Sequence, residues 1–126
     1  MGRQRGEQWM GWACDVGLAV GLKSLSIITD NAEKLVIELL EIATVHQKTD
    51  ENGATATLYV WENINWNRGY WDTEALYHLL EKCPEEDYRI IVACPEYPDH
   101  DDDDAGHWFG NPFDLHKESI ETLQFS

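Results

Sequence analysis

Residues 55–61 read Thr-Ala-Thr-Leu-Tyr-Val-Trp, a run of β-branched and aromatic residues that is typical of a β-strand. We expect this strand to continue through residues 64–66. A second run, Tyr-Arg-Ile-Ile-Val-Ala-Cys at residues 88–94, is almost continuously apolar. Strands of that composition are usually buried on both faces, so we expect residues 88–94 to lie at the centre of a sheet.

A third strand is predicted near the start of the chain. Cys14, Val16, Leu18 and Val20 recur at every second position, which is the spacing of a half-buried strand. We expect residues 25–28 to extend this strand or to form a short one of their own.

An amphipathic helix is predicted over residues 31–46. Asp30 is the expected N-cap, and Glu33 completes an acidic form of the capping box. The apolar side chains of this helix are spaced to share one face; they are Leu35, Val36, Leu39, Leu40, Ile42 and Ala43. The residues from Thr49 to Gly53 then favour a turn.

A second helix is expected to begin after Asp72 as N-cap and to end at Pro84, which cannot continue a helix. Its inward face is expected to consist of Leu76, Leu79, Leu80 and Cys83. The elements therefore follow the order β-α-β-α-β. This order predicts a small α+β domain with two helices packed on one face of a three- or four-stranded sheet.

The chain of 126 residues is expected to form one domain, residues 1–126. Within it we expect residues 1–8 to be a disordered extension and residues 98–107 to be an acidic loop. No stretch reaches the ~18 apolar residues that a membrane helix needs, and no secretory signal is recognisable. We therefore expect a cytoplasmic protein.

The charge of the chain is its most unusual property. Asp and Glu outnumber Lys and Arg by 24 to 9, giving a net charge of −15, whereas a small domain carries a magnitude of about 2–8. Residues 96–126 alone hold nine acids and one Lys. Phosphates would be repelled, so direct binding to nucleic acid or to an anionic membrane is disfavoured. Solubility, a halophilic source and drift are the alternatives to a functional role for the acidity.

The cysteines Cys14, Cys83 and Cys94 are odd in number, form no CxxC and lie in or beside apolar stretches. We expect all three to be buried and reduced, as is usual in the cytosol.

No sequence signal for catalysis or for a cofactor is recognisable. Phosphate-binding loops and nucleophile elbows are absent, and no histidine pair has zinc-ligand spacing. The run from Asp99 to Asp104 could hold a divalent cation, but it does not fit an EF-hand. We therefore expect a non-enzymatic protein without a metal site.

Acids and aromatic residues remain as candidates for binding a partner. Glu38 and Glu41 lie one helical turn apart, where side chains stand ~5–6 Å from each other, a spacing similar to that of phosphates along a DNA strand. The densest acidic clusters and the aromatic candidates complete the expected binding set, which is Glu85, Glu86, Asp87, Asp99, Asp101, Asp102, Asp103, Asp104, Trp66, Trp71 and Trp108. Tyr70 belongs to the same aromatic group, whereas Trp61 is expected in the core.

This composition favours a non-catalytic acidic inhibitor that occupies the positively charged groove of a basic, nucleic-acid-binding partner. A nuclease, a CRISPR effector or a toxin would be such a partner. Phage anti-CRISPR and anti-restriction proteins and bacterial immunity proteins work in this way. The alternatives are an intracellular adaptor or structural interaction domain whose acidity is incidental, and a divalent-metal-binding protein.

Overall fold

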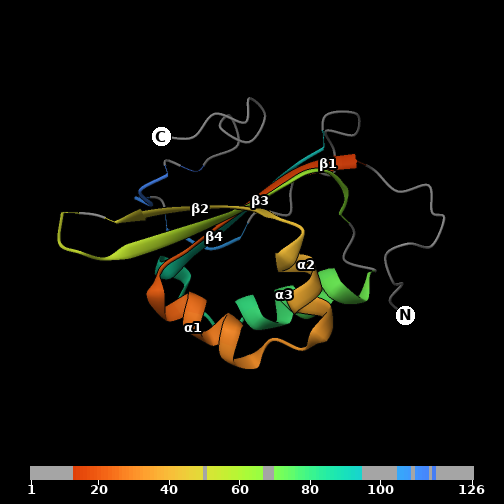
Figure 1. Cartoon of the computed structure of the whole chain (residues 1–126), viewed down its shortest axis with the longest axis horizontal. Coiled ribbons are helices and arrows are strands. Elements are labelled where there is room, and N and C mark those ends of the chain that lie inside the picture. Colours follow the sequence, from red (N-terminus) through yellow and green to blue (C-terminus); the bar gives the residue numbers. More distant parts are fainter. Residues whose placement is uncertain are drawn as a thin grey trace.

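The computed structural model describes residues 13–49, 51–66, 70–94, 105–108, 110–113 and 115. In this part of the chain the elements are β1 (Ala13–Val20), α1 (Leu22–Asn31), α2 (Lys34–Glu41), β2 (Thr44–Thr49), β3 (Thr55–Asn65), α3 (Trp71–Leu80), the 3-10 turn η1 (Glu85–Asp87) and β4 (Tyr88–Ala93). The four strands form one sheet in the order β2-β3-β1-β4, and all neighbours are antiparallel. Figure 1 shows the three helices together on one side of this sheet.

The core between helices and sheet is continuous. Alternate residues of β1 face the helices, and they meet side chains of β3, β4 and all three helices. Buried members of this core include Val16, Leu18, Val20, Ile28, Val36, Leu39, Trp61, Leu76, Leu80 and Ile90. The Trp61 indole N–H donates a 2.8 Å hydrogen bond to the carbonyl of Leu39 in the last turn of α2. That carbonyl has no partner within the helix, so this bond joins the sheet to α2 and satisfies two buried polar groups.

The opposite face of the sheet carries a smaller core. Small side chains of the central strands, such as Ala19 and Ala56, leave room for Phe113 and Leu115, which are both 2% exposed. The Lys48 ammonium donates to the Pro112 carbonyl at 3.1 Å, which ties β2 to the same segment. Residues 105–115, where described, thus cover the face that the helices leave open.

The small α+β domain and the four-stranded sheet confirm the predicted class, but the predicted β-α-β-α-β order is not the one found. The strands expected at residues 55–66 and 88–94 are present as β3 and β4, and the alternating residues 14–20 lie in β1. The central position expected for residues 88–94 is wrong, because β1 lies between β3 and β4. β4 is nevertheless buried on both faces, and Ala105 bridges Ile90 at its outer side.

The predicted helix over residues 31–46 is wrong at both ends. Asp30 lies inside α1, α2 ends at Glu41, and residues 44–46 begin strand β2. Ile42, assigned to the apolar face, is 63% exposed. Thr44 and Val45 are β-branched and pair with β3, and this pairing overrides the helical spacing that precedes them.

The strand expected at residues 25–28 is instead part of α1. Ser24 and Ile28, four positions apart, form the buried side of this helix. In α3 the N-cap is Tyr70 rather than Asp72, whose carboxylate accepts a 2.7 Å hydrogen bond from the Thr73 amide inside the first turn. The inward face of α3 is confirmed, because Leu76, Leu79 and Leu80 are buried.

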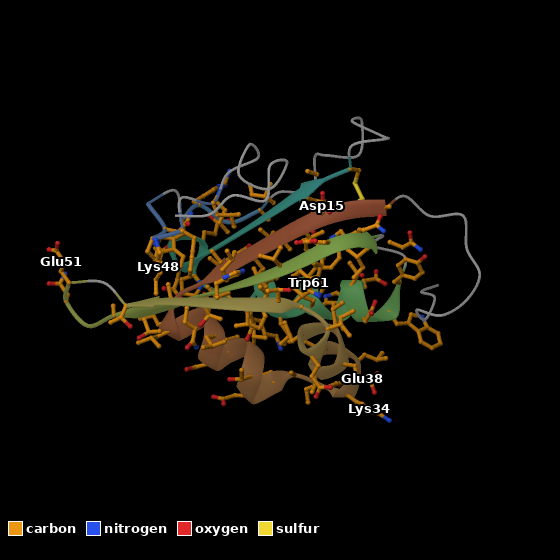
Figure 2. All side chains as sticks on the ribbon, turned by 45° about the horizontal axis from the view of Figure 1, so that its top comes forward. Asp15, Lys34, Glu38, Lys48, Glu51 and Trp61 are labelled. Carbon is orange, nitrogen blue, oxygen red and sulfur yellow. A yellow bond between two sulfur atoms is a disulfide. The ribbon has the colours of Figure 1, made fainter. Side chains whose placement is uncertain are left out.

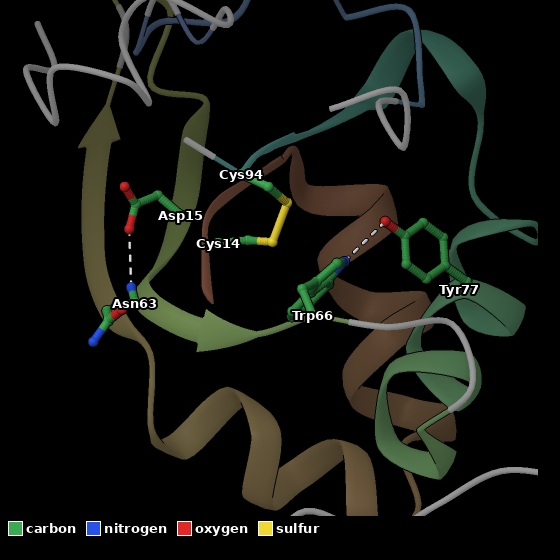
Figure 3. Close-up of a disulfide and its surroundings, with 6 residues drawn as sticks. All are labelled: Cys14, Asp15, Asn63, Trp66, Tyr77 and Cys94. Atoms are coloured by element: carbon green, nitrogen blue, oxygen red, sulfur yellow. Dashed lines mark hydrogen bonds between the residues drawn. A yellow bond between two sulfur atoms is a disulfide. The ribbon is translucent and has the colours of Figure 1, made fainter. Parts of the chain in front are cut away.

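A disulfide joins Cys14 and Cys94 across 80 residues of sequence, so the prediction of three reduced cysteines is wrong (Figure 3). β1 and β4 are antiparallel neighbours with Asp15 opposite Ala93, and this register places the two cysteines side by side on the helix face. Burial of all three cysteines is confirmed, and Cys83 carries a free thiol.

Candidate functional site

A pocket of about 460 Å³ opens at the end of the sheet where β1 passes into α1 and β3 begins. This volume lies within the range of ligand-binding clefts, about 300–1,000 Å³. Its wall comes from five segments, namely Gly21, Leu22 and Lys23; Ala54, Thr55 and Ala56; Pro84; Glu86 and Asp87; and Trp108, Gly110 and Pro112. We call it the end pocket.

The end pocket brings together an acid and an aromatic residue that the sequence separates by 22 positions, Glu86 and Trp108. The chain returns to η1 through the two hydrogen bonds between Ile90 and Ala105, and the Trp108 amide then donates to the Tyr88 carbonyl at 3.2 Å. Gly106 makes the return tight: its φ is +81°, and a Cβ there would collide with the Tyr88 carbonyl oxygen.

The three acids of η1 have different roles. The Asp87 carboxylate accepts a 2.7 Å hydrogen bond from the Ser24 amide, and the Asp87 carbonyl accepts one from the Gly21 amide at 2.9 Å. Glu85 Oε2 lies 3.1 Å from His107 Nδ1. Glu86 is exposed and has no ion pair or hydrogen bond to another residue in the described part of the chain. Among the acids of η1, Glu86 is therefore the one whose carboxylate no described residue engages.

Lys23 and the apolar wall of the end pocket were not predicted from the sequence. Lys23 sits on the first turn of α1 and is one of the residues that line the pocket, and its charge is opposite in sign to that of Glu86. Leu22 is 55% exposed, and Pro84 and Pro112 are partly exposed. These residues meet only because η1 packs on the start of α1, a contact with no local sequence signal.

The acids of α2 are exposed as predicted, but they do not belong to the end pocket. Glu38 and Glu41 are solvent-facing, and Lys34 lies 3.9 Å from Glu38 at the surface. In Figure 2 Lys34 and Glu38 lie at the opposite end of the molecule from Lys48, which hydrogen-bonds to a residue of the end pocket. Glu41 lines a separate, smaller pocket of about 280 Å³.

The aromatic candidates divide by burial. Trp71 is 45% exposed at the start of α3, whereas Trp66 and Tyr70 are 4% and 3% exposed. The Trp66 indole donates to the Tyr77 hydroxyl at 3.2 Å within the core (Figure 3). Trp66 and Tyr70 therefore lie in the core, whereas Trp71 is at the surface. The core position expected for Trp61 is confirmed.

Part of the predicted binding set lies outside the described residues, namely Asp99, Asp101, Asp102, Asp103 and Asp104. Within the described residues, no three His, Cys, Asp or Glu side chains converge as metal ligands would. In the same part of the chain no helix has both the length and the apolar character to cross a membrane.

Comparisons of the chain with protein-family models, with curated proteins and with solved structures found no match.

Proposed function

We propose that this protein is a non-catalytic acidic inhibitor that binds a basic, nucleic-acid-binding protein and occupies its positively charged groove. The observation that carries this proposal is that Glu86, which has no ion pair or hydrogen bond to another described residue, and Trp108 line the same pocket in a chain with a net charge of −15. Such a field attracts a cationic surface over a long range and raises the association rate.

An arginine side chain fits the chemistry of the end pocket. Its guanidinium group pairs with a carboxylate and stacks on an indole ring, and its aliphatic stem packs on apolar walls. Glu86 supplies the carboxylate, Trp108 the ring, and Pro84 and Pro112 the apolar surface. Lys23 works against this binding, so its removal should strengthen it.

The acids of α2 support groove occupation. Glu38 and Glu41 are exposed on a formed helix, where positions three apart stand ~5–6 Å from each other. Successive phosphates of a nucleic-acid strand have a similar spacing. The two carboxylates therefore imitate the charge pattern that Arg and Lys residues of a nucleic-acid-binding groove normally bind. Phage anti-CRISPR or anti-restriction proteins and immunity proteins are the settings that use acidic domains in this way.

The cytoplasmic location expected from the sequence stays a prediction, and the Cys14–Cys94 disulfide weighs against it. Cytosolic thiols are normally kept reduced, whereas disulfides persist in oxidising compartments. Counting the thiols of the protein isolated from its source, with alkylation before lysis, distinguishes one free thiol from three.

The function is tested by affinity capture on the full chain from a lysate of its source cells, at low and high salt. The captured protein is then assayed for nucleic-acid binding or cleavage with and without the acidic protein. We expect capture that weakens steeply with salt, and dose-dependent inhibition. Glu86→Gln should weaken binding about tenfold, because a charged hydrogen bond contributes about 1.5–3 kcal/mol.

Two further variants sharpen this experiment. Lys23→Gln should strengthen binding, because it removes the one cation of the pocket rim among the lining residues. Glu62→Gln removes the same charge as Glu86→Gln from an exposed position on β3 and serves as the control. Capture that is insensitive to salt, or equal losses in Glu86→Gln and Glu62→Gln, would contradict the proposal.

A further inference from the structure

β2 lies at one edge of the sheet formed by the described strands, and five of its six residues are exposed. Three large apolar side chains beside this edge are also unusually exposed: Ile37 by 45%, Ile42 by 63% and Val45 by 49%. Exposed apolar residues are normally scattered, so their grouping at a sheet edge points to an interaction surface.

These side chains share the helix side of the edge. Val45 pairs with Tyr59, which packs against the helix-side core, so both residues face α2. Ile37, Leu40 and Tyr59 line the smaller pocket of about 280 Å³ together with Thr29, Ala32 and Glu41. Val45 and Ile42, the C-cap of α2, thus extend an apolar strip from this pocket to the edge strand. We call this strip the edge groove.

Among the described residues, the helix side of β2 lacks the charged side chains that usually protect an edge strand. Charged residues on an edge normally discourage the pairing of another strand. In β2 the cationic candidates His46 and Lys48 pair with Leu58 and Ala56, whose side chains belong to the core on the opposite face. The helix side of β2 therefore presents Val45, Gln47 and Thr49, all exposed and without formal charge.

An open edge beside an apolar pocket is the arrangement that proteins use to bind extended peptides by strand addition. The backbone of the added strand hydrogen-bonds to the edge, and every second side chain enters a pocket. The edge groove has the parts that such a ligand requires: an edge strand that no other described strand covers, a pocket beside it, and side chains at every second position of β2 that face the pocket side.

The acidic residues around the edge groove indicate which kind of segment binds there. Glu41 lines the pocket and Glu38 is exposed one turn earlier on α2, so the groove has an acidic rim. A second copy of the chain would bring another net charge of −15 against it. We propose that the edge groove binds an extended segment of the basic partner, with apolar residues at alternate positions and Arg or Lys between them. This inference deepens the proposed function and rests on it for the sign of the partner's charge.

The experiment uses the full chain and the acetylated, amidated peptide Lys-Ile-Arg-Val-Arg-Ile-Lys as probe, with binding followed by calorimetry and by amide chemical shifts. We expect binding with shifts in β2 and α2. A peptide with Glu in place of every Lys and Arg should not bind. A peptide N-methylated at alternate residues should also fail, because its backbone donors are blocked.

Surface variants locate the binding. Val45→Asp and Ile37→Ser should each weaken binding about tenfold, since loss of one buried apolar side chain is worth about 1.5 kcal/mol or more. Ser26→Asp adds the same negative charge as Val45→Asp at an exposed position of α1 that lines neither pocket; it is the matched control and should bind as the unchanged protein does.

Three results would overturn the inference: equal binding of the N-methylated or acidic peptide, shifts confined to other elements, or a concentration-dependent dimer that Val45→Asp dissolves. Its failure is separable from that of the proposed function. Capture that depends on Glu86 but not on Val45 removes the edge groove and leaves the inhibitor proposal standing. Capture that depends on Val45 but not on Glu86 would show that the partner binds the edge groove and not the end pocket.

Discussion

The carboxylate of Asp87 accepts a 2.7 Å hydrogen bond from the backbone amide of Ser24, which lies 63 residues earlier in the chain. Ser24 is in the first turn of α1, where backbone amides have no partner within the helix. Gly21, the N-cap of α1, has no side chain to supply one, and Asp87 provides the cap from η1 instead. Asp87, which the sequence assigned to a partner-binding cluster, therefore caps α1 and joins it to η1.

Asp87→Ala should lower the free energy of unfolding by about 1–2 kcal/mol, the usual effect of removing a helix cap. The measurement is a urea titration followed by circular dichroism. Glu86→Ala is the matched control, because it removes the neighbouring carboxylate, which has no partner in the described residues, and should change stability by about 0.5 kcal/mol or less. Equal losses in the two variants would contradict the capping role of Asp87.

Gly21→Ala should also destabilise the protein. The backbone of Gly21 is extended, with φ −82° and ψ −177°, so alanine can adopt it. A Cβ would, however, collide with the Asp87 carboxylate. If that collision is the cause, Gly21→Ala should be less harmful in an Asp87→Ala background. A double-mutant cycle of unfolding free energies measures the coupling, and strict additivity would argue against the contact.

The Cys14–Cys94 disulfide should stabilise the fold by about 2–4 kcal/mol, because it closes a long loop in the unfolded chain. Reduction with dithiothreitol or the paired change Cys14→Ser with Cys94→Ser should lower the midpoint of thermal unfolding. Cys83→Ser should leave the response to reductant unchanged, since Cys83 is outside the bond. A melting temperature that is indifferent to reductant in the unchanged protein would show that the bond contributes nothing.

Three of the four strands were predictable from sequence because their signal is local, whereas residues 44–46 of β2 were assigned to the end of a helix. The runs at residues 55–61 and 88–94 are dense in β-formers, and Cys14 to Val20 alternate as a strand should. The first helix was misplaced because its determinants are not local: the cap of α1 comes from Asp87, and the pairing of Thr44 and Val45 with β3 ends the helical spacing that α2 begins. The disulfide depended on the register of β1 against β4, which no spacing of cysteines reveals.

The candidate site was only partly predictable for the same reason. Composition singled out Glu86 and Trp108 as an acid and an aromatic anchor, but their meeting requires the return of the chain at Ala105 along β4. Trp66 had the same sequence character as Trp71, and only tertiary packing shows that one is buried and the other exposed. Lys23 and the edge groove had no sequence signal at all.

The net charge of −15 should make the fold sensitive to salt. Repulsion among surface carboxylates destabilises the compact state, and salt screens it over a Debye length of about 10 Å at 0.1 M. The midpoint of thermal unfolding should therefore rise as sodium chloride is added from low ionic strength. Replacing Glu38 and Glu41 together by Gln should reduce this increase, and a midpoint that falls with salt would show that favourable ion pairs dominate instead.

The buried thiol of Cys83 should make the protein less stable at alkaline pH. Burial raises the pKa of this thiol above its ordinary value; the hydrogen bond to Ser24 lowers the pKa by less than burial raises it, and the nearby Asp87 carboxylate adds a still smaller increase. Because the pKa is higher in the folded state, the protonated thiol favours the folded protein. Its contribution to the free energy of unfolding is fully present below the unfolded pKa of about 8.5. That contribution is lost as pH rises toward the folded pKa, because only the unfolded chain ionises there.

The urea midpoint should therefore fall above about pH 8.5, and it should fall less in Cys83→Ala, which has no thiol to ionise. The comparison belongs below about pH 10, where tyrosine begins to ionise, since burial also raises the pKa values of Tyr59 and Tyr88. An equal decline in both proteins would assign the alkaline loss to groups other than Cys83.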